Sequence, residues 1–315
     1  MKKKVIFIDS VHEILWFRLE EMGFECIDAT KSTEILLKSE LIDAFGIVIR
    51  ARFQLNEEFL KDYHQLKFIA RSGSGLENID LEFCKRKNIF VFNSPEGNRN
   101  AVAEHALGML LSLLNKIPKA DSEVRQGIWN REDNRGIELD GKTIGIIGYG
   151  NNGSAFAKKL RGFDCNILAH DKYKNNFSND QVKECSINEL YENADVISFH
   201  IPQNTETIYM FDDSFVESME KPFYLLNVSR GKIVKTSSLV RGFKTGKILG
   251  ACLDVLEYEP ASFSTFFNGE IPEDLNYLLK SDRVIFSPHV AGWTEESYLK
   301  LSSVLADKIQ EAFQL

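Results

Sequence analysis

A glycine-rich turn between a strand-like run and a helix-like stretch is the feature that most constrains the fold of this chain. The apolar run Thr143–Ile147 leads directly into Gly148-Tyr149-Gly150-Asn151-Asn152-Gly153, and a helix is expected to begin near Ser154. The first glycine permits the tight turn, the second lets the backbone approach a pyrophosphate, and the third lets helix and strand pack closely. The N–H groups at the start of that helix then favour an anionic group.

The residues after this turn distinguish a cofactor site from an ordinary glycine-rich turn. A second strand-like run, Ile167–Ala169, is followed by Asp171, which lies 18 residues beyond Gly153, close to the spacing of the dinucleotide-binding pattern. A carboxylate there accepts hydrogen bonds from the ribose hydroxyls of NAD and repels the 2′-phosphate of NADP. Strand, loop, helix, strand and acid together predict dinucleotide binding, and NAD is favoured although Lys172 is adjacent to the acid.

Short apolar runs alternate with helix-like stretches along the whole chain. Ten such runs are Val5–Ile8, Phe45–Ile49, Phe68–Arg71, Phe90–Phe92, Thr143–Ile147, Ile167–Ala169, Val196–Phe199, Tyr224–Val228, Ile248–Leu253 and Val284–Phe286. This alternation is typical of parallel β-sheets covered on both faces by helices. Because ten strands are many for one twisted open sheet, the α/β chain is expected to form two doubly wound, Rossmann-like domains.

The domain boundary is predicted close to residue 98. A helical stretch, Asn100–Ile117, is expected to end at Pro118, and the following segment as far as Leu139 is polar without a strand signal. The stretch Glu295–Phe313 predicts a final helix that can return to the first domain. We therefore assign residues 1–98 and 287–315 to one domain, and residues 99–286 to a dinucleotide-binding domain.

Composition argues against several classes of function. Lys and Arg number 38 and Asp and Glu number 46, so the net charge of −8 disfavours nucleic acid as a partner. The most apolar stretch, Leu107–Leu114, is far shorter than the ~20 residues of a membrane span, and Val5–Ile8 is too short for a signal peptide. The five cysteines include no Cys-x-x-Cys, so neither disulfides nor a metal site are indicated. We expect a soluble cytoplasmic protein with no membrane partner.

Three polar segments in the C-terminal half each follow a strand-like run. They are Asn227–Gly231, Asp254–Pro260 and Ser287–Trp293. Each alone would suit a surface turn, but open α/β sheets bind their ligands at the carboxyl ends of strands. An arginine, carboxylates and a histidine are therefore expected at one edge, where the arginine could hold a carboxylate with two parallel hydrogen bonds.

With these segments identified, the sequence resembles the D-isomer-specific 2-hydroxyacid dehydrogenase family, most closely its 3-phosphoglycerate dehydrogenase and glyoxylate/hydroxypyruvate reductase branches. The matching stretches, in order along nearly the whole chain, are Ala70–Asp80, Asn93–Asn98, Ala103–Glu104, Gly141–Gly153, His200–Pro202, Asn227–Val234, Asp254–Pro260 and Ser287–Thr294. The resemblance implies NAD-dependent hydride transfer with a small 2-keto or 2-hydroxy acid, and serine biosynthesis for the first branch. It also implies a discontinuous, flavodoxin-like substrate domain and a homodimer joined through the NAD-binding domains.

The resemblance further implies roles for single residues. Arg230 resembles the arginine that binds the substrate carboxylate and keto oxygen, His289 the general acid/base, and Glu259 the carboxylate that orients the imidazole. The cofactor residues implied are Gly148, Tyr149, Gly150, Asn151, Asn152, Gly153, Asp171, His200, Ile201, Pro202, Thr207, Asn227, Ser229, Arg230, Asp254, His289 and Gly292. The substrate residues implied are Arg50, Ser72, Gly73, Ser74, Arg131, Arg230 and His289.

Several alternatives remain open at the level of sequence. Arg131 resembles an arginine that reaches a substrate phosphate across a dimer, whereas Arg52 is slightly better explained as a surface charge. Asn151 and Asn152 stand where relatives often have Arg-Ile, which removes one possible pyrophosphate contact. His105 is expected to pack or to act as a hinge. Because fold does not determine function, an NAD-binding sensor or corepressor is the alternative from another class.

Overall fold

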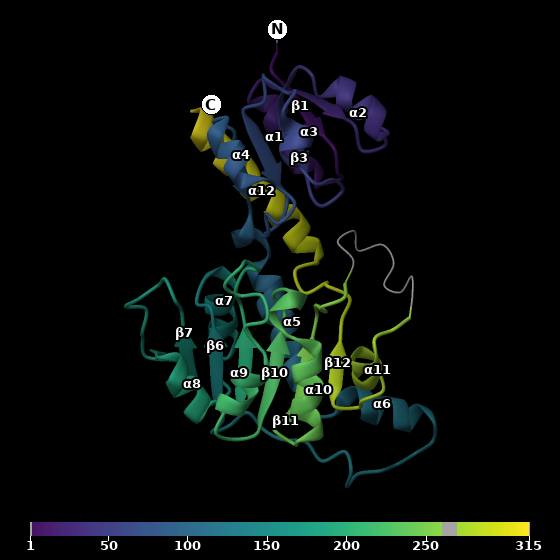
Figure 1. The fold of residues 1–315 in the computed structure, drawn as a ribbon, viewed down its shortest axis with the longest axis vertical. Coiled ribbons are helices and arrows are strands. Elements are labelled where there is room, and N and C mark those ends of the chain that lie inside the picture. The colour runs from purple at the N-terminus through teal and green to yellow at the C-terminus, as the bar shows by residue number, and fades with distance from the viewer. Residues whose placement is uncertain (1, 260–269, 315) are drawn as a thin grey trace. The chain divides into compact units, whose positions relative to one another are not determined.

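Two parallel β-sheets organise the computed structural model, which describes residues 2–259 and 270–314 (Figure 1). The first contains β1 (Lys4–Phe7), β2 (Glu25–Asp28), β3 (Ala44–Ile49), β4 (Phe68–Arg71) and β5 (Phe90–Asn93), in the order β2-β1-β3-β4-β5. The second contains β6 (Thr143–Ile147), β7 (Asn166–His170), β8 (Val182–Glu184), β9 (Val196–Phe199), β10 (Phe223–Asn227), β11 (Ile248–Leu253) and β12 (Val284–Phe286), in the order β12-β11-β10-β9-β6-β7-β8. The predicted fold class is confirmed, and the five-strand order is flavodoxin-like.

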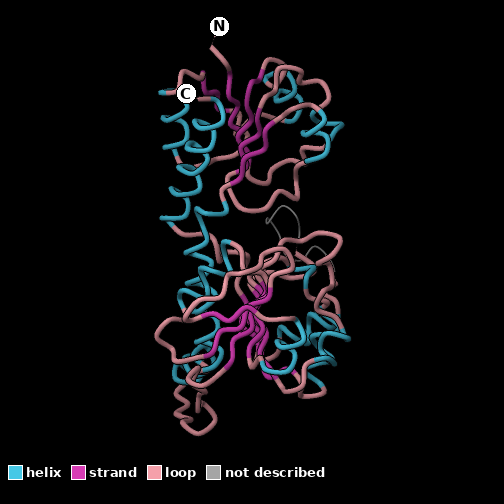
Figure 2. Tube along the Cα trace, turned by 90° about the vertical axis from the view of Figure 1, so that its left-hand side faces the viewer, coloured by secondary structure: helices cyan, strands magenta, loops and turns pink. Residues whose placement is uncertain are grey.

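Helices cover both faces of each sheet (Figure 2). With the first sheet lie α1 (Glu13–Glu21), α2 (Glu34–Glu40), α3 (Glu57–Leu60), α4 (Leu81–Arg86) and α12 (Glu295–Phe313). With the second lie α6 (Ile117–Arg125), α7 (Asn151–Lys159), α8 (Ile187–Asn193), α9 (Asp213–Ser218), α10 (Thr236–Lys244), α11 (Glu273–Leu279) and the 3₁₀ turn η1 (Gly231–Ile233). Helix α5 (Pro95–Leu114) begins in one part of the chain and ends in the other.

The chain divides into two compact units. Unit 1 comprises residues 1–99 and 293–315, and unit 2 comprises residues 100–292. Helix α12 packs beside α1 in unit 1, where the Arg18 guanidinium lies 2.6 Å from the Asp307 carboxylate. Both ends of the described chain therefore belong to one unit, and unit 2 is an insertion between them.

The alternation of side chains along the strands of unit 1 builds two apolar layers. Val5 and Phe7 point to the face covered by α1 and α12, whereas Ile6 points to the face covered by α2, α3 and α4. In a strand, successive side chains lie on opposite faces of the sheet. The near-continuous apolar runs of the sequence follow because both faces are buried.

Unit 2 is layered in the same way. Ile144 and Ile146 of β6 pack with α5 and α7, whereas Ile147 and the neighbouring Ile197 pack with α8, α9, α10 and α11. All strand pairs of this sheet are parallel, so their carboxyl ends share one edge. That edge carries most of the predicted site residues.

The helix boundaries differ from the predictions at three places. Helix α5 begins at Pro95 rather than Asn100, because proline is well suited to the first helical position. Helix α5 ends at Leu114 rather than Ile117, and Pro118 does not end a helix but lies in the first turn of α6. Helix α7 begins at Asn151 rather than near Ser154, so the second half of the glycine motif is already helical.

Candidate active site

The glycine motif lies where the strand order of unit 2 reverses. The chain runs outward from β6 to β7 and β8, and then returns to β9 on the other side of β6. Open α/β sheets bind ligands in the crevice that forms at such a reversal. Gly148 directly follows β6, Asp171 directly follows β7, and His200 directly follows β9, so the structure brings all three to this edge.

The backbone of the glycine motif fits a dinucleotide. Gly148 has φ +93°, and a Cβ there would lie 2.5 Å from the carbonyl oxygen of His200, while a Cβ at Gly153 would lie 2.0 Å from the carbonyl oxygen of Gly148. Only glycine satisfies those two positions. A Cβ at Gly150 would meet no atom within 4 Å, so the space beside the start of α7 is open. This combination suits a pyrophosphate on the helix N-terminus.

Asp171 ties the glycine motif to the turn that follows β7. Its Oδ2 accepts a 2.7 Å hydrogen bond from the Tyr149 N–H, and its Oδ1 accepts bonds from the N–H groups of Tyr173 and Lys174. Burial raises the pKa of Asp171, but these backbone hydrogen bonds outweigh it and lower that pKa below its ordinary value. This structural role was not predicted. The adjacent Lys172 is engaged by Glu206, with 2.9 Å between Nζ and Oε2.

His200 packs behind the glycine motif. Its Nε2 lies 2.8 Å from the hydroxyl of Ser198, its ring centroid lies 5.2 Å from that of Phe156, and its Nδ1 is buried. Burial lowers the pKa of His200 to about 3, so the imidazole is neutral near pH 7.

A substitution of His200 by glutamine is expected to reduce the acid sensitivity of the fold. The unfolded chain binds a proton at His200 below about pH 6.5, whereas the folded chain does not do so until about pH 3, so stability falls as pH falls through this window. Between pH 7 and pH 5, protonation of His200 in the unfolded chain lowers the free energy of unfolding by up to about 2 kcal/mol. Urea unfolding at both pH values measures this change, with the substitution His64→Gln at an exposed position as control. An equal decrease in the free energy of unfolding in the wild type and in His200→Gln would contradict a buried, neutral His200.

The other end of the sheet edge carries Arg230, Glu259 and His289. They follow β10, β11 and β12, which are neighbouring strands. The Nδ1 of His289 lies 3.1 Å from Oε1 of Glu259. The structure therefore forms the histidine–carboxylate pair that the sequence predicted across 30 residues.

Close backbone packing holds the arginine segment against the carboxylate segment. A Cβ at Gly231 would lie 1.9 Å from the carbonyl oxygen of Leu256, so only glycine allows the two turns to touch. The Asn227 amide donates to the Arg230 carbonyl at 3.0 Å, and the Arg230 guanidinium donates to the Ser229 carbonyl at 2.7 Å. Pro260, at the end of the matching acidic stretch, lies outside the described residues.

The residues before His289 form a buried polar network. The Asp254 carboxylate is 2 % exposed, and it accepts hydrogen bonds from the Ser287 hydroxyl and from the N–H groups of Val290 and Ala291. The Ser287 hydroxyl lies 2.8 Å from Nε2 of His105 on α5. Ser287 and His105 were not singled out as site residues, because their neighbours in sequence give no sign of this contact.

The remaining cofactor candidates have structural partners at the same edge. Tyr149 is buried and stacks on Phe177, with ring centroids 4.4 Å apart. The Thr207 hydroxyl donates to the Pro202 carbonyl at 2.7 Å, which closes the loop after β9. The side chain of Ile201 lies against Gly148.

Four predicted substrate residues lie at the carboxyl ends of β3 and β4 in unit 1. Arg50 follows β3, and its guanidinium lies 4.1 Å from the ring centroid of Trp293. Burial lowers the pKa of Arg50, which nevertheless stays charged. Ser72, Gly73 and Ser74 follow β4, and the Ser72 N–H donates to the Ile49 carbonyl of β3. These residues are brought together at one sheet edge.

The structure explains two further arginines of unit 1. Arg52 is not an ordinary surface charge, because its guanidinium donates to the carbonyl oxygens of Ile8, Ala29, Thr30 and Ser32. Arg71, which was not predicted as a site residue, crosses over Gly73, where a Cβ would lie 1.5 Å from its Nη1.

Arg131 lies in the segment that follows α6 in unit 2. It is exposed, and it makes no ion pair within residues 2–259 and 270–314. Within the described residues of unit 2, no hydrogen bond or ion pair joins it to another predicted site residue.

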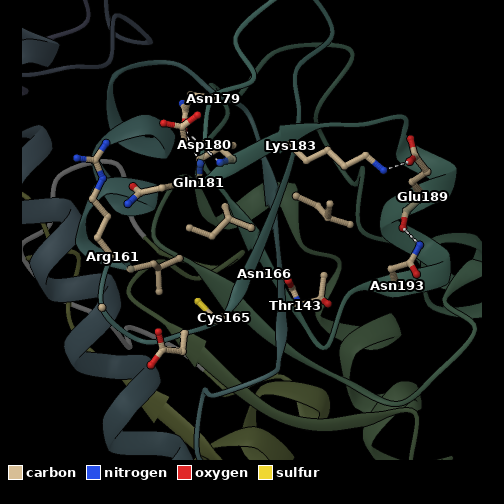
Figure 3. A pocket seen from close by; sticks show the side chains of 16 residues that line it. Thr143, Arg161, Cys165, Asn166, Asn179, Asp180, Gln181, Lys183, Glu189 and Asn193 are labelled. Carbon is tan, nitrogen blue, oxygen red and sulfur yellow. Dashed lines mark hydrogen bonds and ion pairs between the residues drawn. The ribbon is translucent and has the colours of Figure 1, made fainter.

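A hollow of about 570 Å³ lies elsewhere on unit 2 (Figure 3). It is lined from the amino ends of β6 and β7, by residues that include Thr143, Arg161 and Asn166, and its Lys183 pairs with Glu189 at 3.0 Å. It contains none of the predicted site residues, and those that follow strands of this sheet lie at the opposite ends of the strands. No helix among the described residues is long and apolar enough to span a membrane, and these residues contain no cluster of three metal-ligating side chains.

Comparison with known proteins gives a consistent result. Residues 107–291 match the family model "D-isomer specific 2-hydroxyacid dehydrogenase, NAD binding domain". The D-3-phosphoglycerate dehydrogenase of Archaeoglobus fulgidus is 34% identical over 97% of this chain and 56% of its own length. That of Methanocaldococcus jannaschii is 33% identical over 99% of this chain and 57% of its own. The chain thus spans about half the length of these curated relatives.

Solved structures match over nearly the whole chain. A D-lactate dehydrogenase from Aquifex aeolicus, complexed with NAD and lactic acid, has a TM-score of 0.84 and 26% identity, covering 99% of this chain and 96% of that one. An NADPH-dependent glyoxylate/hydroxypyruvate reductase from Sinorhizobium meliloti, complexed with NADP and malonate, has a TM-score of 0.81 and 25% identity, covering 99% and 94%.

A doubly wound unit with a fitted glycine motif, and an arginine, a glutamate and a histidine on adjacent strand ends, defines the class of an NAD-binding oxidoreductase domain. The chain belongs to the D-isomer specific 2-hydroxyacid dehydrogenase family, and unit 2 contains its NAD-binding domain.

Proposed function

We propose that the protein is an NAD-dependent D-2-hydroxyacid dehydrogenase, which transfers hydride between the nicotinamide and a small 2-keto or 2-hydroxy acid. The observation that carries this proposal is the 3.1 Å contact between His289 Nδ1 and Glu259 Oε1, beside Arg230 in an NAD-binding domain. Bound NADH supplies the hydride that is added to the carbonyl carbon, and NAD accepts it in the reverse direction.

In this proposal His289 carries the proton. With Nδ1 held by Glu259, Nε2 is the nitrogen that protonates the carbonyl oxygen as hydride reaches the carbon, and takes that proton back in the oxidation. The Glu259 carboxylate stabilises the imidazolium and fixes the orientation of the ring. Arg230 binds the substrate carboxylate and polarises the keto group, because a guanidinium offers paired donors to planar oxygen pairs.

We further propose that residues of unit 1 bind the substrate. In this proposal the backbone N–H groups of Gly73 and Ser74 bind the substrate carboxylate, at a turn where Gly73 has φ +149°, a conformation rarely open to other residues. Arg50, half-buried against Trp293, adds a cation at the same sheet edge. We propose the division predicted from the sequence, with residues 1–98 and 287–315 as the substrate domain and residues 99–286 as the cofactor domain. The compact units divide at a slightly later point, between residues 292 and 293.

The proposed role of Asp171 is tested by its replacement with serine. We expect the Michaelis constant for NADH to rise by at least tenfold, while that for NADPH changes much less, because ribose hydrogen bonds are lost together with the repulsion of a 2′-phosphate. Some loss of stability is also expected, since three backbone hydrogen bonds end on this carboxylate.

Steady-state kinetics with both cofactors measure this effect. Lys172→Ala is the matched control, because it removes a largely exposed ion pair beside Asp171. It should leave the Michaelis constant for NADH unchanged. A wild-type enzyme that prefers NADPH would show that the ribose assignment is wrong.

We propose 3-phosphoglycerate and its keto acid as the substrates, with glyoxylate or hydroxypyruvate as the alternative. The identity to two D-3-phosphoglycerate dehydrogenases supports this, as do the cations Arg50 and Arg131, because a phosphate of charge near −2 needs several such donors. A homodimer would bring Arg131 of one subunit to the site of the other, and serine biosynthesis would be the pathway served.

If the phosphate assignment is correct, 3-phosphohydroxypyruvate will be reduced with a far lower KM than hydroxypyruvate. Arg131→Ala should reduce the difference between these two KM values. The KM for hydroxypyruvate should stay nearly unchanged, because only the phosphate contact is lost. Arg135→Ala, which removes the exposed pair with Glu132 in the same segment, should change neither constant. Equal KM values for the two substrates in the wild type would leave a glyoxylate/hydroxypyruvate-type reductase.

The homodimer is itself a proposal, supported by apolar exposure in unit 2. Ile117, Val124, Ile128 and Trp129 of α6 and the following segment are between 46% and 80% exposed. Neighbouring exposed apolar side chains commonly mark a protein–protein contact. Sedimentation velocity of the wild type and Trp129→Ser tests whether this surface joins two copies.

An NAD-binding sensor or corepressor is the second candidate, because the same fold serves both classes. NADH oxidation with a panel of 2-keto acids separates the two. Turnover supports the dehydrogenase, whereas tight NADH binding with no turnover of any small keto acid supports the sensor.

A further inference from the structure

His105 lies at the base of the segment that carries His289, although it is far from it in sequence. The imidazole projects from α5, and its Nε2 lies 2.8 Å from the Ser287 hydroxyl and 3.6 Å from Oδ1 of Asp254. The adjacent Glu104 accepts a hydrogen bond from Lys159 at 2.8 Å and another from Asn100. The ring therefore faces the polar network behind His289.

The hydrogen-bond donors of this network can be assigned. The Ser287 hydroxyl has one proton, and its best acceptor is the Asp254 carboxylate at 2.6 Å rather than the Met109 thioether at 3.6 Å. With that proton committed, Ser287 Oγ can only accept from His105, so Nε2 of His105 carries the proton. The hydrogen bonds therefore run in one direction: His105 Nε2 donates to Ser287 Oγ, and the Ser287 hydroxyl donates to Asp254.

Asp254 in turn holds the backbone on both sides of His289. Its carboxylate accepts from the N–H groups of Val290 and Ala291, at 2.9 and 3.0 Å, and its carbonyl oxygen accepts from the His289 N–H at 2.7 Å. His289 itself has φ +55°, a left-handed conformation that costs a non-glycine residue about 1–2 kcal/mol. Such a conformation persists only where surrounding bonds impose it.

We propose that His105 is a positioning residue for His289, acting through Ser287 and Asp254 to fix the left-handed backbone that presents the imidazole to Glu259. This inference rests on the proposed function, because it takes His289 to be the acid/base. Loss of the His105 donor leaves Ser287 free to rotate away from Asp254, and the segment 287–291 then samples conformations in which the His289–Glu259 contact is broken.

Three variants test the proposal in the full-length protein. His105→Leu should lower kcat/KM for the keto acid about tenfold, while the dissociation constant of NADH, followed by its fluorescence, changes less than twofold. His105→Gln keeps an N–H donor near the position of Nε2 and should recover activity to within about threefold of the wild type. His105→Asn is too short to reach Ser287 and should behave like the leucine variant. The exposed His64→Gln is the control and should equal the wild type.

Amide hydrogen exchange provides a readout that does not depend on turnover. The N–H groups of Val290 and Ala291 should exchange about tenfold faster in His105→Leu and His105→Asn than in the wild type and in His105→Gln. If the wild type turns over no keto acid, the proposed function fails, but the exchange data still decide the role of His105. Equal exchange and equal kcat/KM in the glutamine and asparagine variants would overturn the proposal, even if the leucine variant did not fold.

Discussion

Replacing His289 by alanine is expected to lower kcat by ~10²–10⁴-fold, the largest single effect that this structure predicts. A positioned general acid contributes a factor of this size, and the 3.1 Å contact with Glu259 shows the orientation that such a role requires. The KM for NADH should change little, because the loss is in proton transfer. Single-turnover kinetics with excess enzyme measure it directly.

Glu259→Gln serves as the companion variant. Its amide keeps a hydrogen-bonding group near Nδ1 but removes the negative charge that stabilises an imidazolium, so we expect a smaller loss of kcat than for His289→Ala. An unchanged kcat in His289→Ala would remove this residue from the mechanism.

Gly150→Ala is expected to weaken NADH binding by at least ~100-fold, an effect much larger than any change in stability. No atom of the protein lies within 4 Å of a Cβ at this position, so the added methyl group meets no clash in the folded chain. The added methyl group would instead occupy the space through which the pyrophosphate approaches the backbone. Titration of NADH fluorescence, together with thermal unfolding, separates the two effects.

Two other glycines are the controls for this test. Gly108→Ala, at an exposed position of α5 with open space around it, should leave NADH affinity unchanged and stabilise the helix by up to about 1 kcal/mol. Gly153→Ala should lose both affinity and stability, because its Cβ would lie 2.0 Å from the Gly148 carbonyl oxygen. If Gly150→Ala binds NADH as tightly as the wild type does, the pyrophosphate does not lie beside Gly150.

Ten strands of the two sheets could be predicted from the sequence, including the edge strands β5 and β12, whereas the edge strands β2 and β8 could not. The central strands were recognisable because parallel strands buried on both faces form continuous apolar runs. The two that were missed, β2 and β8, are edge strands whose residues are partly exposed, such as Glu25 and Lys183. These two strands depend mainly on pairing with a neighbour and have no apolar run, whereas the edge strands β5 and β12 keep the apolar runs Phe90–Phe92 and Val284–Phe286.

The candidate site shows a similar limit. The placement of Arg230, Glu259 and His289 at one edge could be predicted because each lies in a polar segment that follows a recognisable strand, and the strand ends share one edge. The contacts of Arg52 with four carbonyl oxygens could not, since they depend on how separate loops fold back toward one another. His105 belongs to the same group, because the packing of α5 against the sheet determines which way its ring points.

The return of α12 to unit 1 determines the order in which the newly made chain can fold on the ribosome. Leu305, Ala306 and Ile309 of this helix are fully buried in the core beside α1, and Lys308 pairs with Glu96 at 2.9 Å. Residues 1–99 are synthesised first but lack this part of their core until α12 emerges. Unit 2 is complete in sequence before that point, so the segment made second is the first that can reach its native state during translation.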